Sequence, residues 1–435
     1  MLCKKALRRA RWAWYMYDWA NSAFPTTVLT VFLGPYLTQV AYQAAGEAGT
    51  LIVGGLSITP DAFYPFAVSV SVLLQIVLLP LVGALADSRG WKKLLMLLFA
   101  YTGALATVGL YWVEGDRYWL GGVLFVIANL CFGASVVMYN AFLPDLAAPH
   151  ERDALSARGW AIGYLGGGIL LGLNLLFLSA AQQWGIPPAQ AVRLCLASAG
   201  VWWGVFTLIP AFGIPASLGR EGRKTALSSA GHWWNQLWQT LRLLQAPALL
   251  FLVAYFFYND GVQTVIALSG QFASRELRLP IEVITSTLLL VQFVAFGGAL
   301  LFGWLAQRWG TVPALLSGLL VWIGVLLYSG LGLHTEEEFR LVAIAIGVVL
   351  GGTQALSRSL FSQYIPEGRS AEYFSFYELT ERGSSWLGPL LFATVLQWTG
   401  NYRWAIGGIT CLFIAGGFLL LCLYLRERKI CPPRI

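Results

Sequence analysis

Twelve apolar stretches dominate this sequence of 435 residues, and each is long enough to cross a bilayer as a helix. Hydrophobic residues make up 57% of the chain and charged residues only 11%, about half the charged share of a soluble domain. This composition argues against a soluble enzyme, a disordered chain and a fibrous protein. The stretches cover residues 12–40, 63–86, 94–113, 118–143, 158–181, 191–212, 247–270, 281–306, 311–333, 341–363, 376–397 and 402–425.

The stretches predict membrane helices. They are longer and more uniformly apolar than the alternating strands of a membrane barrel, which have roughly ten residues. If the N-terminus lies in the cytoplasm, most of the 28 Lys and Arg fall on inner segments, so both termini are expected inside. The net charge of +7 comes from short basic clusters beside apolar runs, which argues against nucleic acid as a partner.

One connection, residues 213–246, is much longer than the others and separates six stretches from six. It predicts three parts: an N-terminal six-helix bundle (1–212), a cytoplasmic linker (213–246) and a C-terminal six-helix bundle (247–435). Trp233, Trp234 and Trp238 share one face of a possible amphipathic helix in the linker. Such a helix is expected in the headgroup layer; the alternative is a helix packed on a bundle.

The two halves of the sequence repeat the same features in the same order. This order indicates two six-helix units in parallel orientation, the repeat pattern of major facilitator transporters. The matched pairs are Asp18 and Asn21 with Asp260 and Gln263, Gly83–Gly90 with Gly303–Gly310, Pro144-Asp145 with Pro366-Glu367, and Arg158-Gly159 with Arg382-Gly383.

The loop after the second stretch reads Gly83-Ala-Leu-Ala-Asp87-Ser-Arg89-Gly90-Trp-Lys92-Lys93. It resembles the signature loop of the major facilitator superfamily between helices 2 and 3. The resemblance implies an all-α membrane protein with 12 transmembrane helices in two pseudo-symmetric six-helix bundles. It also implies a cytoplasmic latch in this loop. Glu378 and Glu381, with Arg382, are expected to mark the cytoplasmic end of the eleventh helix; the alternative is that they form the site that Asp87 approaches. The second copy has Gln307 in place of Asp87, so the latch is expected mainly in the first copy.

A narrower resemblance covers most of the chain. Four segments look like the vacuole-effluxer, autophagy-related permease branch of the superfamily, which includes bacterial members. That branch is associated in fungi with export of amino acids from the vacuole, and the short loops here favour a bacterial plasma membrane. The segments are Tyr17–Phe24, Tyr258–Thr264, Gln354–Leu360 and Leu387–Leu390.

Several polar and ionisable side chains fall inside the stretches, where they are costly unless they face a cavity or a partner. In the superfamily, helices 1, 4, 7 and 10 line the central cavity, which implies a substrate or proton path along these side chains. The candidates are Asp18, Asn21, Asn140, Asn259, Asp260, Gln263, Gln354 and Arg358.

Asp260 is the strongest of these candidates. It lies roughly 20 Å into its helix, near the midplane, where substrate and coupling-ion sites are expected. We expect it to exchange a proton or to hold a substrate amine; the alternative is a structural hydrogen bond. Asp18 is shallower and suits a gate. Arg358 is expected to snorkel to the surface, to pair with Glu378 or Glu381, or to contact an acidic solute group.

The leading interpretation is a secondary active transporter, a permease for a small polar solute such as an amino acid, with a coupled proton. The expected partners are this solute, the proton and the lipid bilayer, with no nucleic acid, and the superfamily default is a monomer. No nucleotide-binding loop, cofactor site or metal cluster is found in the sequence. The alternatives are a non-transporting sensor or lipid-handling protein of the same fold, and a membrane-embedded enzyme, for which no nucleophile–base pair is visible.

Overall fold

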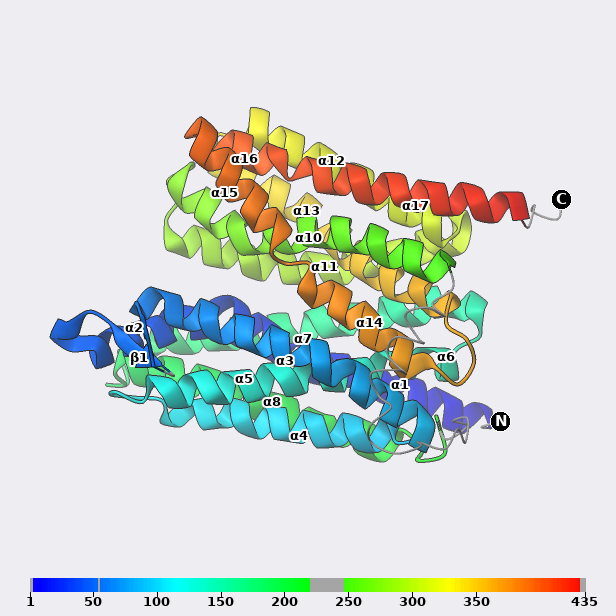
Figure 1. Cartoon of the computed structure of the whole chain (residues 1–435), viewed down its shortest axis with the longest axis horizontal. Coiled ribbons are helices and arrows are strands. Elements are labelled where there is room, and N and C mark those ends of the chain that lie inside the picture. Colours follow the sequence, from blue (N-terminus) through cyan, green and yellow to red (C-terminus); the bar gives the residue numbers. More distant parts are fainter. Residues whose placement is uncertain (1–2, 54, 220–245, 431–435) are drawn as a thin grey trace. The chain divides into compact units, whose positions relative to one another are not determined.

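The computed structural model describes residues 3–53, 55–219 and 246–430 (Figure 1). Residues 220–245, with the expected amphipathic helix, lie outside the described part. The chain forms two compact units, one of Met1–Phe142 with Ile162–Lys224 and one of Leu143–Ala161 with Thr225–Ile435. The division therefore falls inside a single helix, α7.

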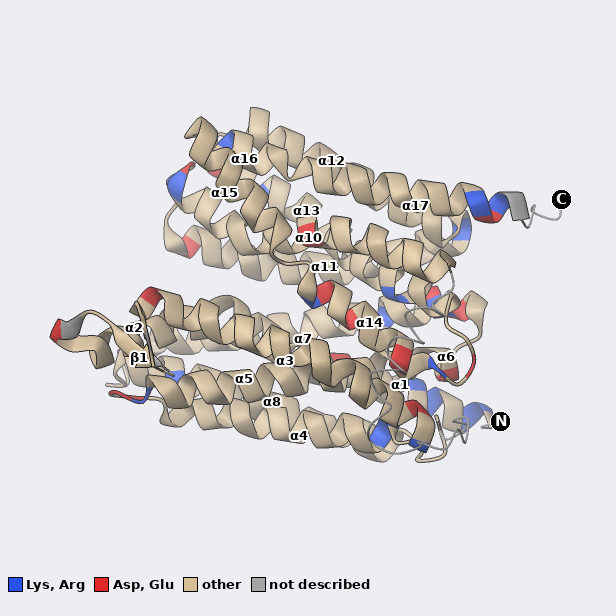
Figure 2. Cartoon of the chain, in the orientation of Figure 1, with Lys and Arg blue, Asp and Glu red and all other residues tan. Residues whose placement is uncertain are grey.

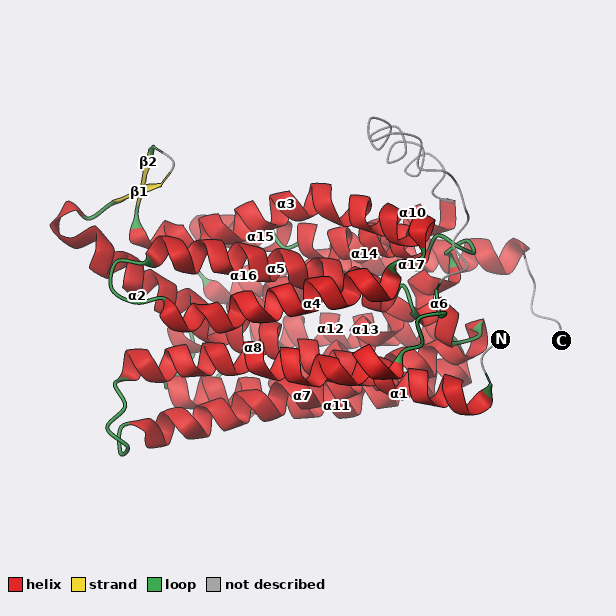
Figure 3. Cartoon of the chain, turned by 90° about the horizontal axis from the view of Figure 1, so that it is seen from below, coloured by secondary structure: helices red, strands yellow, loops and turns green. Residues whose placement is uncertain are grey.

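The first unit is built from long helices. They are α1 (Lys4–Asn21), the π-helix η1 (Phe24–Phe32), α2 (Leu33–Ala45), α3 (Pro60–Arg89), α4 (Lys92–Gly109), α5 (Tyr118–Asn140), most of α7 (Arg152–Ala181) and α8 (Pro188–Gly213). One feature was not expected from the sequence: two short antiparallel strands between α2 and α3, β1 (Leu51–Val53) and β2 (Leu56–Ile58) (Figure 3).

The second unit is also helical. It contains α6 (Leu143–Leu146), the first residues of α7, α10 (Ala246–Arg275), α11 (Ile281–Trp309), α12 (Thr311–Leu331), α13 (Glu336–Gln363), α14 (Ser370–Gly383), α15 (Leu387–Thr399), α16 (Tyr402–Gly408) and α17 (Thr410–Ile430).

Ten candidate spans in the described part are helical, long and apolar enough to cross a membrane. Charged residues gather toward the helix ends and leave long uncharged lengths between them (Figure 2). The two other predicted stretches, 12–40 and 376–397, are not single α-helices. Both are interrupted near a proline, because proline lacks a backbone N–H and its ring clashes with the carbonyl four residues earlier.

The first interruption lies in residues 22–32. Pro25 follows Asn21 by four residues, and α1 ends at Asn21. The chain continues as a π-helix over Phe24–Phe32, in which the Thr30 hydroxyl donates to the Pro25 carbonyl at 2.9 Å. Wide π-turns are rare and occur frequently at functional sites.

The second interruption separates α14 from α15. Gly383 ends α14 and Leu387 begins α15, so Pro389 lies in the first turn of α15, where its missing N–H would have no helical partner. Figure 1 shows the non-helical connection between the two helices. A broken helix at membrane depth leaves backbone groups that need polar partners.

In the first unit, a row of glycines lets α7 approach α1 and η1 closely. A Cβ added to Gly166 would lie 2.6 Å from the Trp19 carbonyl oxygen, and one added to Gly167 would lie 2.5 Å from the Thr26 hydroxyl. Such contacts are shorter than van der Waals packing permits, so only glycine fits at these positions.

Gly166→Ala should therefore destabilise the protein by about 1–3 kcal/mol, because the new methyl group meets backbone rather than a movable side chain. Thermal unfolding in detergent micelles measures the effect. Gly324→Ala in α12 is the matched control, since a Cβ there meets nothing within 4 Å. Equal melting temperatures for the two variants would contradict this account of the α7 packing.

Candidate functional site

The break between α14 and α15 is held at its first end by Asn259 of α10. The Asn259 amide nitrogen donates to the Glu381 carbonyl at 3.0 Å and to the Ser384 hydroxyl at 3.2 Å. The Glu381 carbonyl is one of those that the end of α14 leaves without a helical partner. Asn259 is completely buried, so this amide serves the broken backbone inside the unit.

Asp260, the next residue of α10, faces the other end of the break. The backbone amide of Gly388, the second residue of α15, faces its carboxyl group. The approach is close, because a Cβ on Gly388 would lie 2.0 Å from the Thr264 hydroxyl and 3.2 Å from Asp260 Oδ2. Asp260 therefore lies at the N-terminus of α15, the positive end of the helix dipole.

The Asp260 carboxyl group is unusual in its environment. The side chain has 0% exposure, and neither carboxyl oxygen makes a hydrogen bond of good geometry with any residue that the structure describes. A buried carboxylate without a paired cation is costly. The Asp260 carboxyl group avoids this cost if it binds a proton or pairs with a cation.

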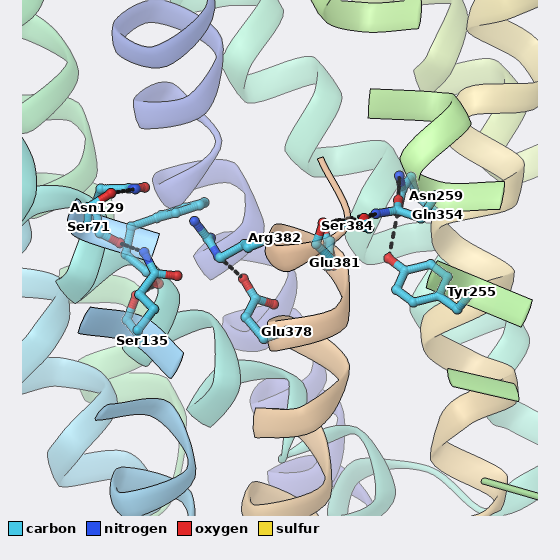
Figure 4. A network of polar contacts seen from close by, with 12 residues as sticks. Ser71, Asn129, Ser135, Tyr255, Asn259, Gln354, Glu378, Glu381, Arg382 and Ser384 are labelled. Atoms are coloured by element: carbon cyan, nitrogen blue, oxygen red, sulfur yellow. Dashed lines mark hydrogen bonds and ion pairs between the residues drawn. The ribbon is translucent and has the colours of Figure 1, made fainter. Parts of the chain in front are cut away.

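A network of polar side chains extends from Asn259 toward α13 (Figure 4). Gln354 donates to Asn259 Oδ1 at 3.2 Å, and the Tyr255 hydroxyl donates to Gln354 Oε1 at 3.4 Å. Close by on the same two helices, the Tyr258 and Ser357 hydroxyls share a hydrogen bond of 2.7 Å. The structure therefore brings the predicted residues Asn259 and Gln354 together.

An ion pair lies on α14, one turn before the break. Arg382 Nε donates to Glu378 Oε1 at 2.7 Å, and Glu378 is only 2% exposed (Figure 4). Its other oxygen, Oε2, has no partner among the described residues. Glu381 faces the Tyr255 hydroxyl. Both glutamates, which the sequence assigned to the latch, thus lie beside the network of α10 and α13.

Arg358 of α13 is buried rather than extended toward the surface. Its Nε donates to the Ser156 hydroxyl and a terminal nitrogen donates to the Ser156 carbonyl, both at 2.9 Å. The guanidinium also lies 5.3 Å from the ring centre of Trp160, a cation–π contact. Glu378 and Glu381 lie near enough to feel its charge, so the predicted pairing with them stays a prediction.

In the first unit, Asp18 accepts a hydrogen bond of 2.5 Å from the Tyr139 hydroxyl. Trp14 fixes that tyrosine, because its ring stacks on Tyr139 at 4.5 Å and its indole N–H donates to the Tyr139 carbonyl. The predicted residues Asn21 and Asn140 are both buried in this unit.

A second polar group in the first unit joins α3 and α5. The Asn129 amide donates to the Ser71 hydroxyl at 2.7 Å (Figure 4). Gln75 donates to the Asn129 carbonyl at 3.0 Å. All three side chains are buried, and Gln75 Oε1 has no partner within the described part of the chain.

The loop assigned to the latch is a tight turn between α3 and α4. Gly90 ends α3 with φ of +66°, a left-handed conformation that favours glycine. Asp87 and Lys92 are both buried, with Lys92 Nζ 3.9 Å from Asp87 Oδ1 at the start of α4. Arg89 is exposed beside Trp91.

Sequence reasoning missed several residues of this site. Gln263 was paired with Asp260, yet Thr264 is the residue that lies beside Asp260 at Gly388, and Gln263 is only partly buried. Tyr139, Tyr255, Ser357 and Ser384 were also missed. Tyrosines and serines are common in apolar helices and do not stand out there. The position of the α14–α15 break, signalled by Gly388-Pro389, could have directed attention to Tyr255, Ser357 and Ser384, but not to Tyr139, which lies in the first unit.

Comparison with known proteins gives a consistent result. The family model described as "Vacuole effluxer Atg22 like" matches residues 6–430. An uncharacterised MFS-type transporter of Bacillus subtilis, YxiO, is 31% identical, covering 94% of this chain and 93% of that protein. Autophagy-related protein 22 of Kluyveromyces lactis is 27% identical, covering 90% of this chain and 88% of its own length.

Solved structures show the same fold. The proton:xylose symporter XylE has a TM-score of 0.73 at 11% identity, covering 96% of each chain. The human organic anion transporter MFSD10 has a TM-score of 0.70 at 16% identity, covering 95% of this chain and 99% of its own. The fold is thus the predicted all-α major facilitator fold. The chain is a multi-pass membrane transporter rather than an enzyme, and it belongs to the vacuole effluxer Atg22-like family of the major facilitator superfamily.

Proposed function

We propose that this transporter moves a small polar, amino acid-like solute together with a proton, by alternating access of its two bundles. The relatives support the general mode. Two structural neighbours are proton symporters, one for fucose and one for xylose. The family description names a vacuole effluxer, which supports a solute of the kind exported from vacuoles.

The observation that carries the proposal is the position of Asp260. It is a fully buried carboxyl group, without a hydrogen bond of good geometry among the described residues, at the N-terminus of the half-helix α15. Discontinuous membrane helices with charged groups at their half-helix ends form coupling-ion and substrate sites in transporters. The N–H of Gly388 is a donor, which suits a carboxyl group that alternates between ionised and protonated forms better than it suits a metal cation.

The solute is proposed to bind beside this proton site. Asn259, Gln354 and Tyr255 offer both donors and acceptors in one connected network. The Glu378–Arg382 pair adds one charge of each sign, as a zwitterionic solute requires. Asp18 with Tyr139 in the first unit belongs to the proposed gate.

The domain organisation is also proposed from the sequence. The chain would comprise an N-terminal bundle of 1–212, a linker of 213–246 and a C-terminal bundle of 247–435, with the latch at Gly83–Lys92. The distribution of Lys and Arg supports cytoplasmic termini, and the Bacillus relative supports a bacterial plasma membrane. A monomer is the proposed state.

Counterflow in proteoliposomes tests this proposal. Liposomes that contain the purified protein are loaded with one unlabelled amino acid at a time, and entry of a radiolabelled trace of the same amino acid is followed. Accumulation of at least one amino acid above protein-free liposomes is expected. If no amino acid accumulates while a sugar or an organic anion does, the solute class is wrong; if none of these solutes moves, the transport proposal fails.

A further inference from the structure

The second copy of the repeated loop, residues 303–310, lacks the acidic residue of the first copy. Gln307 stands in place of Asp87, and its side chain is exposed. In each copy a long helix begins directly after the loop, α4 at Lys92 and α12 at Thr311. The start of such a helix has unpaired N–H groups and a positive dipole end, so an acidic side chain is favourable there.

Asp153 of α7 lies at the start of α12. Its Oδ2 accepts a hydrogen bond of 2.8 Å from the hydroxyl of Thr311, the first residue of α12. Ser359 of α13 faces the same carboxyl group. Asp153 is only 8% exposed, so this carboxyl group is enclosed as Asp87 is in the first copy.

The backbone around Asp153 is shaped for this contact. A Cβ added to Gly303 would lie 2.5 Å from the Ala157 Cβ, so the glycine that begins the second loop copy admits the first turns of α7. The equivalent glycine in the first copy is Gly83. The second loop copy has therefore kept its glycine while the carboxylate comes from another part of the chain.

Two further contacts attach the same segment to α13. Ser156 donates to the Ala355 carbonyl at 2.7 Å and accepts from Arg358. Arg152 donates to the Ser362 carbonyl at 2.7 Å, at the end of α13. These contacts are hydrogen bonds between polar groups, which can break and form again without repacking an apolar core.

We propose that Asp153 supplies the carboxylate that the second loop copy lacks at Gln307, and that it anchors residues 143–161 to α12 and α13 as a releasable clamp. The role of the clamp rests on the proposed transport function, because the clamp would open when the transporter changes the side of the membrane to which its site is accessible. Its existence is a property of the resting protein and is measured without any solute.

The test measures how often the clamp opens. Ser362→Cys places a thiol at a completely buried position beside the Arg152 contact. In purified protein in detergent micelles, the rate of maleimide alkylation of this cysteine, quantified on its peptide by mass spectrometry, reports opening. Asp153→Ala should raise the rate roughly tenfold, since a hydrogen bond to a charged group is lost. Thr311→Val, which removes only the donor hydroxyl, should raise the rate in the same direction.

Restoring the carboxylate on the loop is the decisive arm. Gln307→Asp added to Asp153→Ala should return the alkylation rate toward that of the parent protein. Glu367→Ala is the matched control, because it also removes one acidic residue but lies at an exposed turn after α13. It should leave the alkylation rate unchanged. The proposal is overturned if Asp153→Ala and Thr311→Val both react at the parental rate, or if Gln307→Asp fails to slow the reaction. Failure of solute transport, with these rates as expected, would instead count against the proposed function alone.

Discussion

Asp260→Asn is expected to abolish solute accumulation driven by a pH gradient, while exchange of solute across the membrane continues. Asn is nearly isosteric with Asp and can still receive the Gly388 amide, but it cannot bind and release a proton. Uptake by the parent protein should rise as the solute-donating side is acidified, whereas uptake by the variant should not depend on pH. Proteoliposomes with an imposed pH gradient measure accumulation, and counterflow at equal pH measures exchange.

Glu282→Gln provides the control for this substitution. Glu282 is an exposed acidic residue at the start of α11, so its loss changes the net charge equally but leaves the buried site intact. Its uptake should keep the parental pH dependence. If Asp260→Asn accumulates solute with the same pH dependence as the parent, Asp260 is not the proton site and has a structural role.

Arg358→Gln is expected to destabilise the protein by about 3–5 kcal/mol, because buried partners are left without their cation. The side chain is 2% exposed and donates two hydrogen bonds to Ser156, and its charge faces Glu378 and Glu381. Transport should be lost as well, since both the proposed clamp and the glutamates of the proposed solute site depend on this arginine. Thermal unfolding in micelles and counterflow measure the two effects.

Arg340→Gln, on the same helix, is the control that separates the effect of losing a buried charge from the effect of losing any arginine charge. Arg340 forms an ion pair with Glu336 at 2.7 Å, but the two side chains are 49% and 43% exposed. An exposed pair of this kind contributes at most about 1 kcal/mol, so the variant should melt close to the parent and should transport normally. Equal losses from both variants would contradict the account of Arg358 as a buried structural charge.

The sequence predicted the spans because hydropathy and helix length are local properties. It also pointed to Asp260 and Arg358, because ionisable side chains stand out in apolar stretches whatever their partners are. It did not predict the π-helix over Phe24–Phe32. A proline inside an apolar run indicates that the helix is disrupted there. Whether the helix kinks, forms a wide turn or breaks depends on how it packs against its neighbours.

The contacts within the site were harder to predict for the same reason. The Glu378–Arg382 pair has a spacing of four residues on one helix, so it is readable from sequence. The bond from Asn259 to the Glu381 carbonyl joins residues 122 positions apart. Likewise, the repeat showed that Gln307 replaces an acidic residue, but only the fold shows Asp153 at the start of α12.

The most direct test of the account is to measure solute and proton movement together in one preparation. Proteoliposomes are loaded with the pH indicator pyranine, and the amino acid that gives counterflow is added outside without any imposed gradient. The account predicts that solute entry acidifies the lumen in the parent protein and leaves it unchanged in Asp260→Asn. Solute entry by the parent protein without any change in luminal pH would contradict it.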